Sequence, residues 1–230
     1  MRADCLIIAI DGPAGSGKST VAKAVAQRLG IDYLDTGALY RAIALWLDKR
    51  GVPPEESERL KEELKKLRVK IKGGKVYVNG CDVTEAIRSP RVDAIVSAYS
   101  ALPTVRECLF SIQRAQVNCR GLVADGRDMG TVVFPEAQVK VFLTASPEER
   151  ARRRWLESSD KGGLSYEEVL KGIRERDALD SGRSLSPLRA APDACVIDTT
   201  LLSVDEVVDR IIDLVKLLKQ NNGGTCGTYG

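Results

Sequence analysis

The sequence contains no histidine among its 230 residues. This absence excludes catalytic triads that depend on a histidine base, and it removes a frequent ligand of catalytic zinc. Phosphoryl transfer is not excluded, because lysine, arginine and Mg²⁺ can position and neutralise phosphates without any histidine. The absence of histidine therefore excludes enzymes with a histidine base and leaves phosphoryl transfer as a possible reaction.

Long apolar segments are missing too, since no stretch approaches the ~20 residues of a membrane span. The six cysteines lie far apart and form no C-x-x-C pair. We interpret them as small buried apolar residues in a reducing cytoplasm, and not as a metal site or a disulfide framework. A core strand is expected to begin about five residues from the N-terminus, which leaves no room for a signal peptide.

An excess of charge of one sign is also lacking, because the formal net charge is only +3. We therefore expect no nucleic acid and no membrane among the partners, while basic residues gathered locally suit a small polyanion. With 43% hydrophobic and 29% charged residues, the composition is that of an ordinary globular protein. We expect a monomer. The length allows one α/β core with an elaboration, or two small domains.

The clearest positive feature is the segment from Gly12 to Ser19, which fits the phosphate-binding pattern G-x-x-x-x-G-K-[ST]. An apolar run over residues 5–10 predicts a buried parallel strand before it. A helical pattern over Thr20–Leu29 follows, with Gly30 as the expected C-cap. This context opposes the alternative of a chance match in a glycine-rich turn, and it predicts a nucleoside triphosphate site.

In such a loop, backbone N–H groups and the positive end of the helix dipole point at one place. Lys18 is then expected to reach the β- and γ-phosphates, and the Ser19 hydroxyl to ligate Mg²⁺. The expected contacts to the triphosphate are Gly12, Pro13, Ala14, Gly15, Ser16, Gly17, Lys18, Ser19 and Thr20.

The remaining pattern alternates strands and helices, with one change of period. Residues 68–72 and 75–78 alternate polar and apolar around Gly73-Gly74, which predicts a small antiparallel sheet inserted in a parallel α/β fold. Capping-box patterns start at Ser146, Ser165 and Ser203. Other strands are expected at 32–35, 122–124, 139–143 and 195–197, and other helices at 38–50, 55–67, from Pro90 after the N-cap Ser89, and at 103–119.

Arginine is concentrated between residues 145 and 183. Arg150, Arg153 and Arg154 share one helical face, and two such helices joined by the glycine-rich segment 158–163 would form a lid that closes over the phosphates. Arg176, Asp180 and Arg183 share another face if their helix runs that far. The alternative is a solvated face on which Glu148, Glu149, Glu168 and Glu175 pair with the arginines.

Two polar clusters follow expected strands, at residues 35–41 and 124–131. Ligands of open α/β sheets bind beyond the carboxyl ends of the strands, so both clusters are expected beside the phosphate-binding loop. Buried Arg and Asp are costly unless they are paired or bind a ligand. An internal Arg–Asp pair is the structural alternative.

At these residues the chain resembles the bacterial cytidylate kinases. The resemblance runs from about Ile7 to Val215, and its most specific part is Ala124-Asp-Gly-Arg-Asp-Met-Gly-Thr131. It implies phosphorylation of CMP or dCMP by ATP with Mg²⁺, on an adenylate-kinase-like parallel sheet that carries an antiparallel insert. Small nucleotides are then the partners.

The resemblance also implies a role for each matching residue. The cytosine-reading side chains are Ser97, Arg106 and Asp128, and the ribose contacts are Asp180 and Arg176. The monophosphate contacts are Arg41, Arg127 and Arg183, with Thr36 and Tyr40 lining the site. Arg153 and Arg154 match lid arginines that face ATP. With Lys18, the catalytic charges are expected on Arg127, Arg153, Arg154 and Arg183.

We therefore expect a P-loop α/β kinase with three working parts. They are a core (about 1–50, 120–150 and 184–219), a monophosphate-binding region with the insert (51–119) and a lid (151–183), followed by a disordered tail (220–230). Rival functions are a kinase of similar fold for UMP, AMP or shikimate, a GTPase switch, or a nucleotide-gated interaction module. The lack of an N-K-x-D motif argues against the GTPase.

Overall fold

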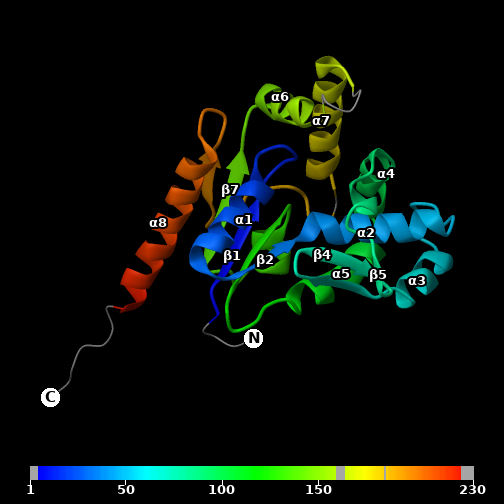
Figure 1. Cartoon of the computed structure of the whole chain (residues 1–230), viewed down its shortest axis with the longest axis horizontal. Coiled ribbons are helices and arrows are strands. Elements are labelled where there is room, and N and C mark those ends of the chain that lie inside the picture. The colour runs from blue at the N-terminus through cyan, green and yellow to red at the C-terminus, as the bar shows by residue number, and fades with distance from the viewer. Residues whose placement is uncertain (1–4, 159–163, 184, 224–230) are drawn as a thin grey trace. The chain divides into compact units, whose positions relative to one another are not determined.

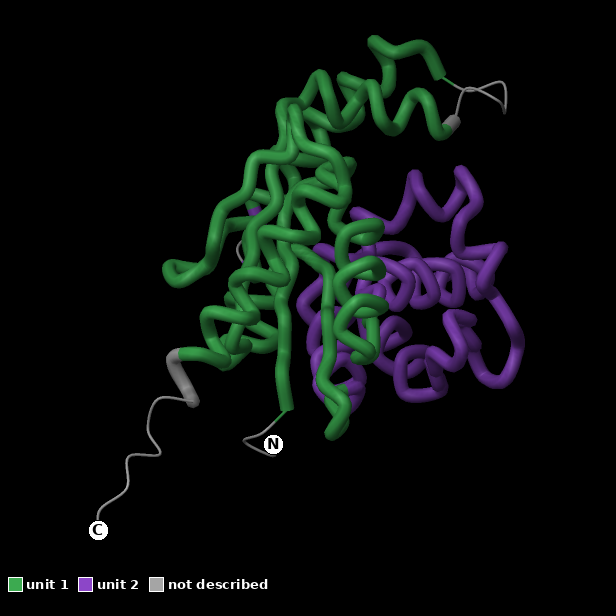
Figure 2. The backbone as a smooth tube through the Cα atoms, turned by 60° about the vertical axis from the view of Figure 1, so that its left-hand side comes forward, with its two compact units in different colours: residues 1–34, 117–182, 186–230 green, residues 35–116, 183–185 purple. Residues whose placement is uncertain are grey.

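The chain folds into two structural units, which Figure 2 shows in different colours. Unit 1 comprises residues 1–34, 117–182 and 186–230, and unit 2 comprises residues 35–116 and 183–185. The computed structural model describes residues 5–158, 164–183 and 185–223 (Figure 1). Most of the predicted glycine-rich tip at 158–163, and the predicted tail beyond residue 223, lie outside the described residues.

Unit 1 is built on a five-stranded sheet with the order β2-β6-β1-β7-β8. β1 pairs in parallel with β6 and β7, and β7 pairs in parallel with β8. All five residues of β1 are buried, as expected of a central strand in an α/β sheet. The strands are β1 (Ile7–Asp11), β2 (Asp32–Asp35), β6 (Leu122–Gly126), β7 (Val139–Thr144) and β8 (Cys195–Asp198).

Helices α1 and α8 pack together over this sheet and bury its main apolar cluster (Figure 1). Ile8 and Ile10 of β1, Val25 of α1 and Ile211 of α8 are each fully buried in that cluster. Helices α6 and α7 contact each other beyond the sheet. The helices of unit 1 are α1 (Lys18–Leu29), α6 (Pro147–Ser158), α7 (Tyr166–Ser181) and α8 (Val204–Gly223).

Unit 2 combines helices with the predicted antiparallel sheet, whose strand order is β3-β4-β5. Gly73 and Gly74 have φ values of 57° and 75°, which the tight turn between β3 and β4 requires. The predicted insert is therefore confirmed. Its elements are α2 (Thr36–Lys49), α3 (Glu58–Lys65), β3 (Val69–Lys72), β4 (Lys75–Val78), β5 (Cys81–Asp82), the short helix η1 (Ala86–Arg88), α4 (Pro90–Ser100) and α5 (Pro103–Arg114).

Several boundaries differ from the predicted ones because side chains cap the helices elsewhere. Asp35 accepts from the N–H of Ala38, so α2 begins at Thr36, and Ser57 caps α3, which begins at Glu58. Helix α5 ends at Arg114 rather than Cys119, and α8 continues past Lys219 to Gly223. The π-helical turn η2 (Met129–Val133) was not predicted.

The capping boxes at Ser165 and Ser203 are confirmed, but the one at Ser146 is incomplete. Its Oγ accepts from the N–H of Glu149 at 3.2 Å, while the N–H of Ser146 donates to Oγ1 of Thr200. The Glu149 carboxylate pairs with Arg152 and Arg153 instead of returning to Ser146. Tertiary partners have therefore replaced half of the local motif.

The cysteines depart from their predicted burial. Cys5 is buried and Cys108 is intermediate, but Cys81, Cys119 and Cys195 are exposed free thiols. The interpretation of all cysteines as buried apolar residues is therefore wrong for three of the five described ones. Among the helices formed by the described residues, none is both long and apolar enough to cross a membrane.

Candidate active site

The loop between β1 and α1 requires glycine at two positions. Gly12 has a φ of 148°, and a Cβ there would lie 2.0 Å from the carbonyl oxygen of Leu143 in β7. Gly15 has a φ of 78°, and its Cβ would lie 3.0 Å from the Cβ of Arg150. A larger residue at either position would therefore be strained or collide with its neighbour. The predicted strand, loop and helix are confirmed, and the loop stands at the carboxyl end of β1, where such sheets bind ligands.

Lys18 begins α1, and its side chain folds back over this loop. Its Nζ donates to the carbonyl oxygen of Pro13 at 2.6 Å, and the residue is only 6% exposed. Burial holds the pKa of Lys18 well below its usual range, and the positive charge of Arg127 lowers it further. A bound polyanion would raise this pKa again, because nearby negative charge favours the protonated amine. The ammonium is thus placed to gain from phosphate binding.

Ser19 and Asp125 bring oxygen ligands together at the start of α1. The Ser19 Oγ donates to one carboxylate oxygen of Asp125 at 2.7 Å, and the Tyr33 hydroxyl donates to the other at 2.8 Å. Hydroxyl and carboxylate oxygens are the hard ligands that Mg²⁺ prefers. The two residues therefore fit a Mg²⁺ ion with water and phosphate completing its shell. The predicted site included Ser19 but missed Asp125, although it directly follows the predicted strand 122–124.

Asp11, at the end of β1, is a second strand-end carboxylate that the prediction missed. It accepts the backbone N–H groups of Met129 and Gly130, both at 2.8 Å, and so fixes the turn η2 to the central strand. Burial raises the pKa of Asp11 to about 7, although both backbone hydrogen bonds act to lower it. Burial of the Asp11 carboxylate is unfavourable, and its two hydrogen bonds to the turn after β6 partly offset this.

Four predicted acceptor residues belong to unit 1. Arg127 follows β6, and its Nε donates to the carboxylate of Asp180 in α7 at 2.8 Å. Asp180 is 1% exposed and Asp128 is 3% exposed. Arg176 also lies in α7. The Arg–Asp pair that sequence left as an alternative does form, and it joins two of the predicted ligand contacts.

The other six predicted acceptor residues belong to unit 2: Thr36, Tyr40, Arg41, Ser97, Arg106 and Arg183. Arg41 forms an ion pair with Asp93. The Arg106 guanidinium lies 5.5 Å from the ring centroid of Tyr40, and it donates to the carbonyl oxygen of Ser100 at 3.0 Å. Helix α7 ends at Ser181, so Arg183 lies beyond it and does not share a helical face with Arg176 and Asp180.

The arginines of α6 are held more firmly than the lid prediction implied. Arg150 is 3% exposed and donates twice to the Asp177 carboxylate and once to the carbonyl oxygen of Ala14 in the phosphate-binding loop. Arg153 donates to Glu149 and to both oxygens of Thr199. Arg150 anchors α6 on the loop, and Thr199 bonds to Ser16. No sequence pattern predicted these two contacts, because the partners lie far apart along the chain.

The alternative of a salt-bridged helical face is realised for part of this region. Arg152 pairs with Glu149, and Arg174 pairs with Glu148, at 2.7 and 2.8 Å. Attraction to Arg152, and then to Arg153, lowers the pKa of Glu149 to about 2. Two of the four glutamates suggested as partners therefore pair with arginines, and Glu175 lies 4.0 Å from Lys171.

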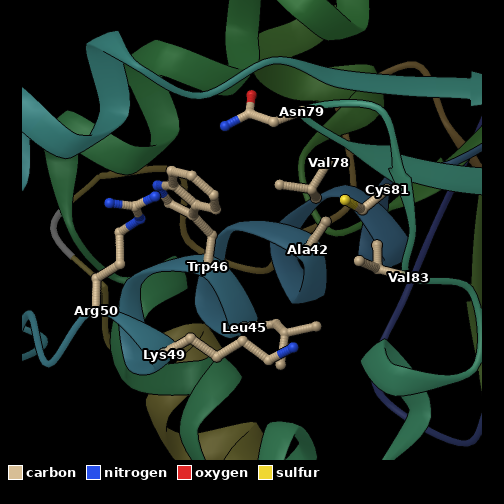
Figure 3. A pocket seen from close by; sticks show the side chains of 9 residues that line it. All are labelled: Ala42, Leu45, Trp46, Lys49, Arg50, Val78, Asn79, Cys81 and Val83. Atoms are coloured by element: carbon tan, nitrogen blue, oxygen red, sulfur yellow. The ribbon is translucent and has the colours of Figure 1, made fainter.

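A pocket of about 380 Å³ lies within unit 2 (Figure 3). Trp46 of α2 borders it on one side, and Val78 and Cys81 of the small sheet border it on the other (Figure 3). Its wall is mainly apolar, and none of the predicted site residues is among those that line it within the described part of unit 2. The candidate active site is therefore defined by its charges and not by this cavity.

Comparisons with known proteins agree with the phosphate-binding geometry. A family model described as cytidylate kinase matches residues 8–217. A cytidylate kinase of Fervidobacterium nodosum is 54% identical over 210 residues, which cover 91% of this chain and 95% of that protein. A second, from Caldanaerobacter subterraneus, is 50% identical over 210 residues, covering 91% of this chain and 94% of that protein.

Solved structures share the architecture at low sequence identity. A gluconokinase from Sinorhizobium meliloti 1021 has a TM-score of 0.50 and 14% identity, covering 98% of this chain and 99% of that one. At this identity the likeness concerns the fold alone. Together with the sheet order and the loop after β1, it confirms the predicted α/β P-loop fold with a central parallel sheet and a small antiparallel one.

Proposed function

We propose, because the chain belongs to the cytidylate kinase family, that it transfers the γ-phosphoryl group of ATP to CMP and dCMP. The observation that carries the proposal is the charge arrangement around the phosphate-binding loop. Lys18 is buried there with Arg127 and Asp125 close enough to shift its pKa, and Ser19 is bonded to Asp125. Phosphoryl transfer needs such positioned charge more than it needs a nucleophile from the protein.

In the proposed reaction, an oxygen of the CMP phosphate attacks the γ-phosphorus of ATP in line, and the bond to the bridging oxygen of ADP breaks. The residues from Gly12 to Thr20 hold the triphosphate, and Lys18 neutralises charge on the migrating group. Arg127, Arg153, Arg154 and Arg183 supply further positive charge. Mg²⁺, when bound by Ser19 and Asp125, screens the phosphate oxygens. The reaction needs no covalent intermediate and no general base.

We also propose the residues that bind the acceptor CMP. Ser97, Arg106 and Asp128 would read cytosine, and Arg176 and Asp180 would hold the ribose. Thr36, Tyr40, Arg41, Arg127 and Arg183 would bind the monophosphate. Asp128 lies just after β6, at the carboxyl end of a sheet strand, where α/β sheets bind their ligands, and this position supports a ligand-binding role.

An acceptor panel tests the proposal. Formation of ADP in a coupled assay is measured with CMP, dCMP, UMP, AMP and shikimate at equal concentrations, with and without Mg²⁺. We expect CMP and dCMP to be used far better than the others, and little ATP hydrolysis without an acceptor. Equal use of UMP or AMP would assign another acceptor, and acceptor-independent GTP hydrolysis would support a switch.

We further propose that the enzyme acts as a monomer in the cytoplasm, with small nucleotides as its partners and without nucleic acid or membrane. The small net charge of +3 supports the expectation of no nucleic-acid partner, and the free thiols of the described cysteines support a reducing compartment. Size-exclusion chromatography with light scattering tests the monomer, because a mass near twice 25.0 kDa would contradict it.

A further inference from the structure

Ser100, which the family resemblance does not assign, contacts three proposed acceptor residues within unit 2. Its Oγ donates to the carbonyl oxygen of Ser97 at 3.1 Å. Its carbonyl oxygen accepts from Nη1 of Arg106 at 3.0 Å, and its Oγ accepts from Nη2 of Arg183 at 3.3 Å. The residue is 9% exposed, so these hydrogen bonds are largely shielded from water.

The position of Ser100 in the fold explains this gathering. It is the last residue of α4, and the carbonyl groups in the last turn of a helix lack intrahelical partners. That end of a helix also carries partial negative charge, which favours cations. Two guanidinium groups, from Arg106 and Arg183, occupy it.

The serine hydroxyl has a single proton, and the bond to Ser97 uses it. The oxygen therefore accepts from Arg183 through a lone pair. The hydrogen bond to Ser97 fixes the rotation of the hydroxyl and hence the direction of its lone pairs. Alanine would keep the backbone bond to Arg106 but lose the bond to Arg183. The hydroxyl thus holds Arg183 on the residue whose backbone carbonyl oxygen binds Arg106.

We propose that Ser100 is a positioning residue that sets the spacing between Arg183 and Arg106. This inference rests on the proposed function, in which Arg183 binds the monophosphate and Arg106 reads the base. Because both guanidinium groups bond to one residue, their spacing is fixed, and so is the distance between the parts of the nucleotide that they would bind. Ser100 then acts on acceptor binding and leaves the ATP site unchanged.

The test compares Ser100→Ala with the matched control Ser111→Ala. Ser111 lies in α5 and, like Ser100, bonds the carbonyl oxygen three residues earlier, at 3.4 Å from Cys108, but it is exposed. We expect Ser100→Ala to raise the KM for CMP about 10-fold or more, as for a lost bond to a charged group, and to lower kcat to a smaller extent because Arg183 also supplies charge to the transfer. The KM for ATP should stay unchanged. Ser111→Ala should change none of the three constants.

A double-mutant cycle with Arg183→Ala separates positioning from a general structural effect. If Ser100 acts through Arg183, adding Ser100→Ala to Arg183→Ala should raise the KM for CMP less than ~1.5-fold further. If Ser100→Ala folds poorly, Ser100→Cys serves as the test variant, because it keeps the size of the side chain while its thiol is a weak acceptor. It should raise the KM for CMP in the same way. Melting temperatures of all variants are measured alongside.

The outcomes separate this inference from the function on which it rests. A wild-type protein without CMP-dependent ADP formation would overturn both. An active wild type whose Ser100→Ala and Ser100→Cys variants keep the KM of Ser111→Ala would overturn the positioning role alone. Effects that multiply in the cycle would also overturn it, because Ser100 would then act independently of Arg183.

Discussion

Two groups of charged residues in unit 1 are held in opposite ways. The strand-end group comprises Asp11, Lys18, Asp125 and Asp128, and each of these is at most 6% exposed. The helix-face group comprises Arg152, Arg153 and Arg174 on α6 and α7, and each of these pairs with Glu148 or Glu149. One group is buried at the carboxyl ends of strands, while the other lies in ion pairs nearer to solvent.

The difference indicates where ligand binding is built into the fold. An exposed ion pair contributes only about 0–1 kcal/mol, so the Arg174–Glu148 pair, with both side chains more than half exposed, can be exchanged for other contacts at little cost. Buried charges cost far more, and they persist in proteins when they are paired or bind a ligand. The strand-end group should therefore dominate activity, and the helix-face group should modulate it.

The largest effect is expected at Lys18. Lys18→Ala should lower the rate of phosphoryl transfer at least ~10³-fold, because it removes a charge positioned on the migrating group. The fold should persist, which circular dichroism and thermal melting would check. Lys23→Ala, an exposed lysine on the same helix, is the control and should keep full activity. An active Lys18→Ala enzyme would remove this loop as the ATP site and break the contrast between the groups.

Asp128 comes second in expected effect. Asp128→Ala should lower kcat/KM for CMP about 10²-fold, as for loss of a charge-assisted bond of ~2–3 kcal/mol. Cytosine presents an N4 amino donor to the carboxylate, whereas uracil presents an acceptor, so the variant should also narrow the gap between CMP and UMP. The KM for ATP should change little. Steady-state kinetics with both acceptors are the measurement. A variant that kept its full preference for CMP would show that residues other than Asp128 read the cytosine.

A smaller effect, on kcat, is expected for Arg153 of the helix-face group together with its neighbour Arg154. Replacing Arg153 and Arg154 together by alanine should lower kcat about 10-fold or more while leaving the KM for CMP near wild type, if these groups turn toward ATP late in the reaction. The matched control replaces Arg152 and Arg174, which also pair with Glu149 and Glu148. Unchanged kcat with a lower melting temperature would identify Arg153 and Arg154 as part of a salt-bridged surface.

The same contrast explains how much was predictable from the sequence. The phosphate-binding loop, the left-handed C-cap at Gly30 and the hairpin at Gly73-Gly74 are set by neighbours a few residues apart, and all three are present. The family resemblance then supplied the acceptor residues, whose roles stay predictions.

Partners distant in sequence could not be predicted in this way. Asp11 meets Met129 and Gly130 only because β1 and β6 are adjacent in the sheet, and this contact accompanies the unpredicted turn η2. Arg150 finds Asp177 through the packing of α6 on α7. At Ser146 the sequence motif is present, but the N–H of Ser146 donates to Thr200 and the Glu149 carboxylate pairs with two arginines instead.

For the buried carboxylate of Asp11, the expected effect is on the stability of the fold. Its pKa is raised from 3.8 to about 7 in the folded protein, so between about pH 4 and pH 7 the folded state holds a proton that the unfolded state releases. Stability from this group is therefore greatest at low pH and is lost as the pH rises toward 7. Asp11→Asn lacks this dependence. Its melting temperature, relative to wild type, should rise between pH 4.5 and 7 and then stay constant.

The measurement is differential scanning calorimetry of both proteins without nucleotide, at pH steps from 4.5 to 8. Asp193→Asn is the control, because Lys140 lowers the pKa of that exposed carboxyl and places its titration below the range scanned. Its difference from wild type should stay flat. A flat difference for Asp11→Asn as well would mean that Asp11 is ionised throughout, stabilised by the N–H groups of Met129 and Gly130. The strand-end group would then keep a permanent negative charge beside Lys18, and that charge would favour the protonated form of the lysine across the whole range.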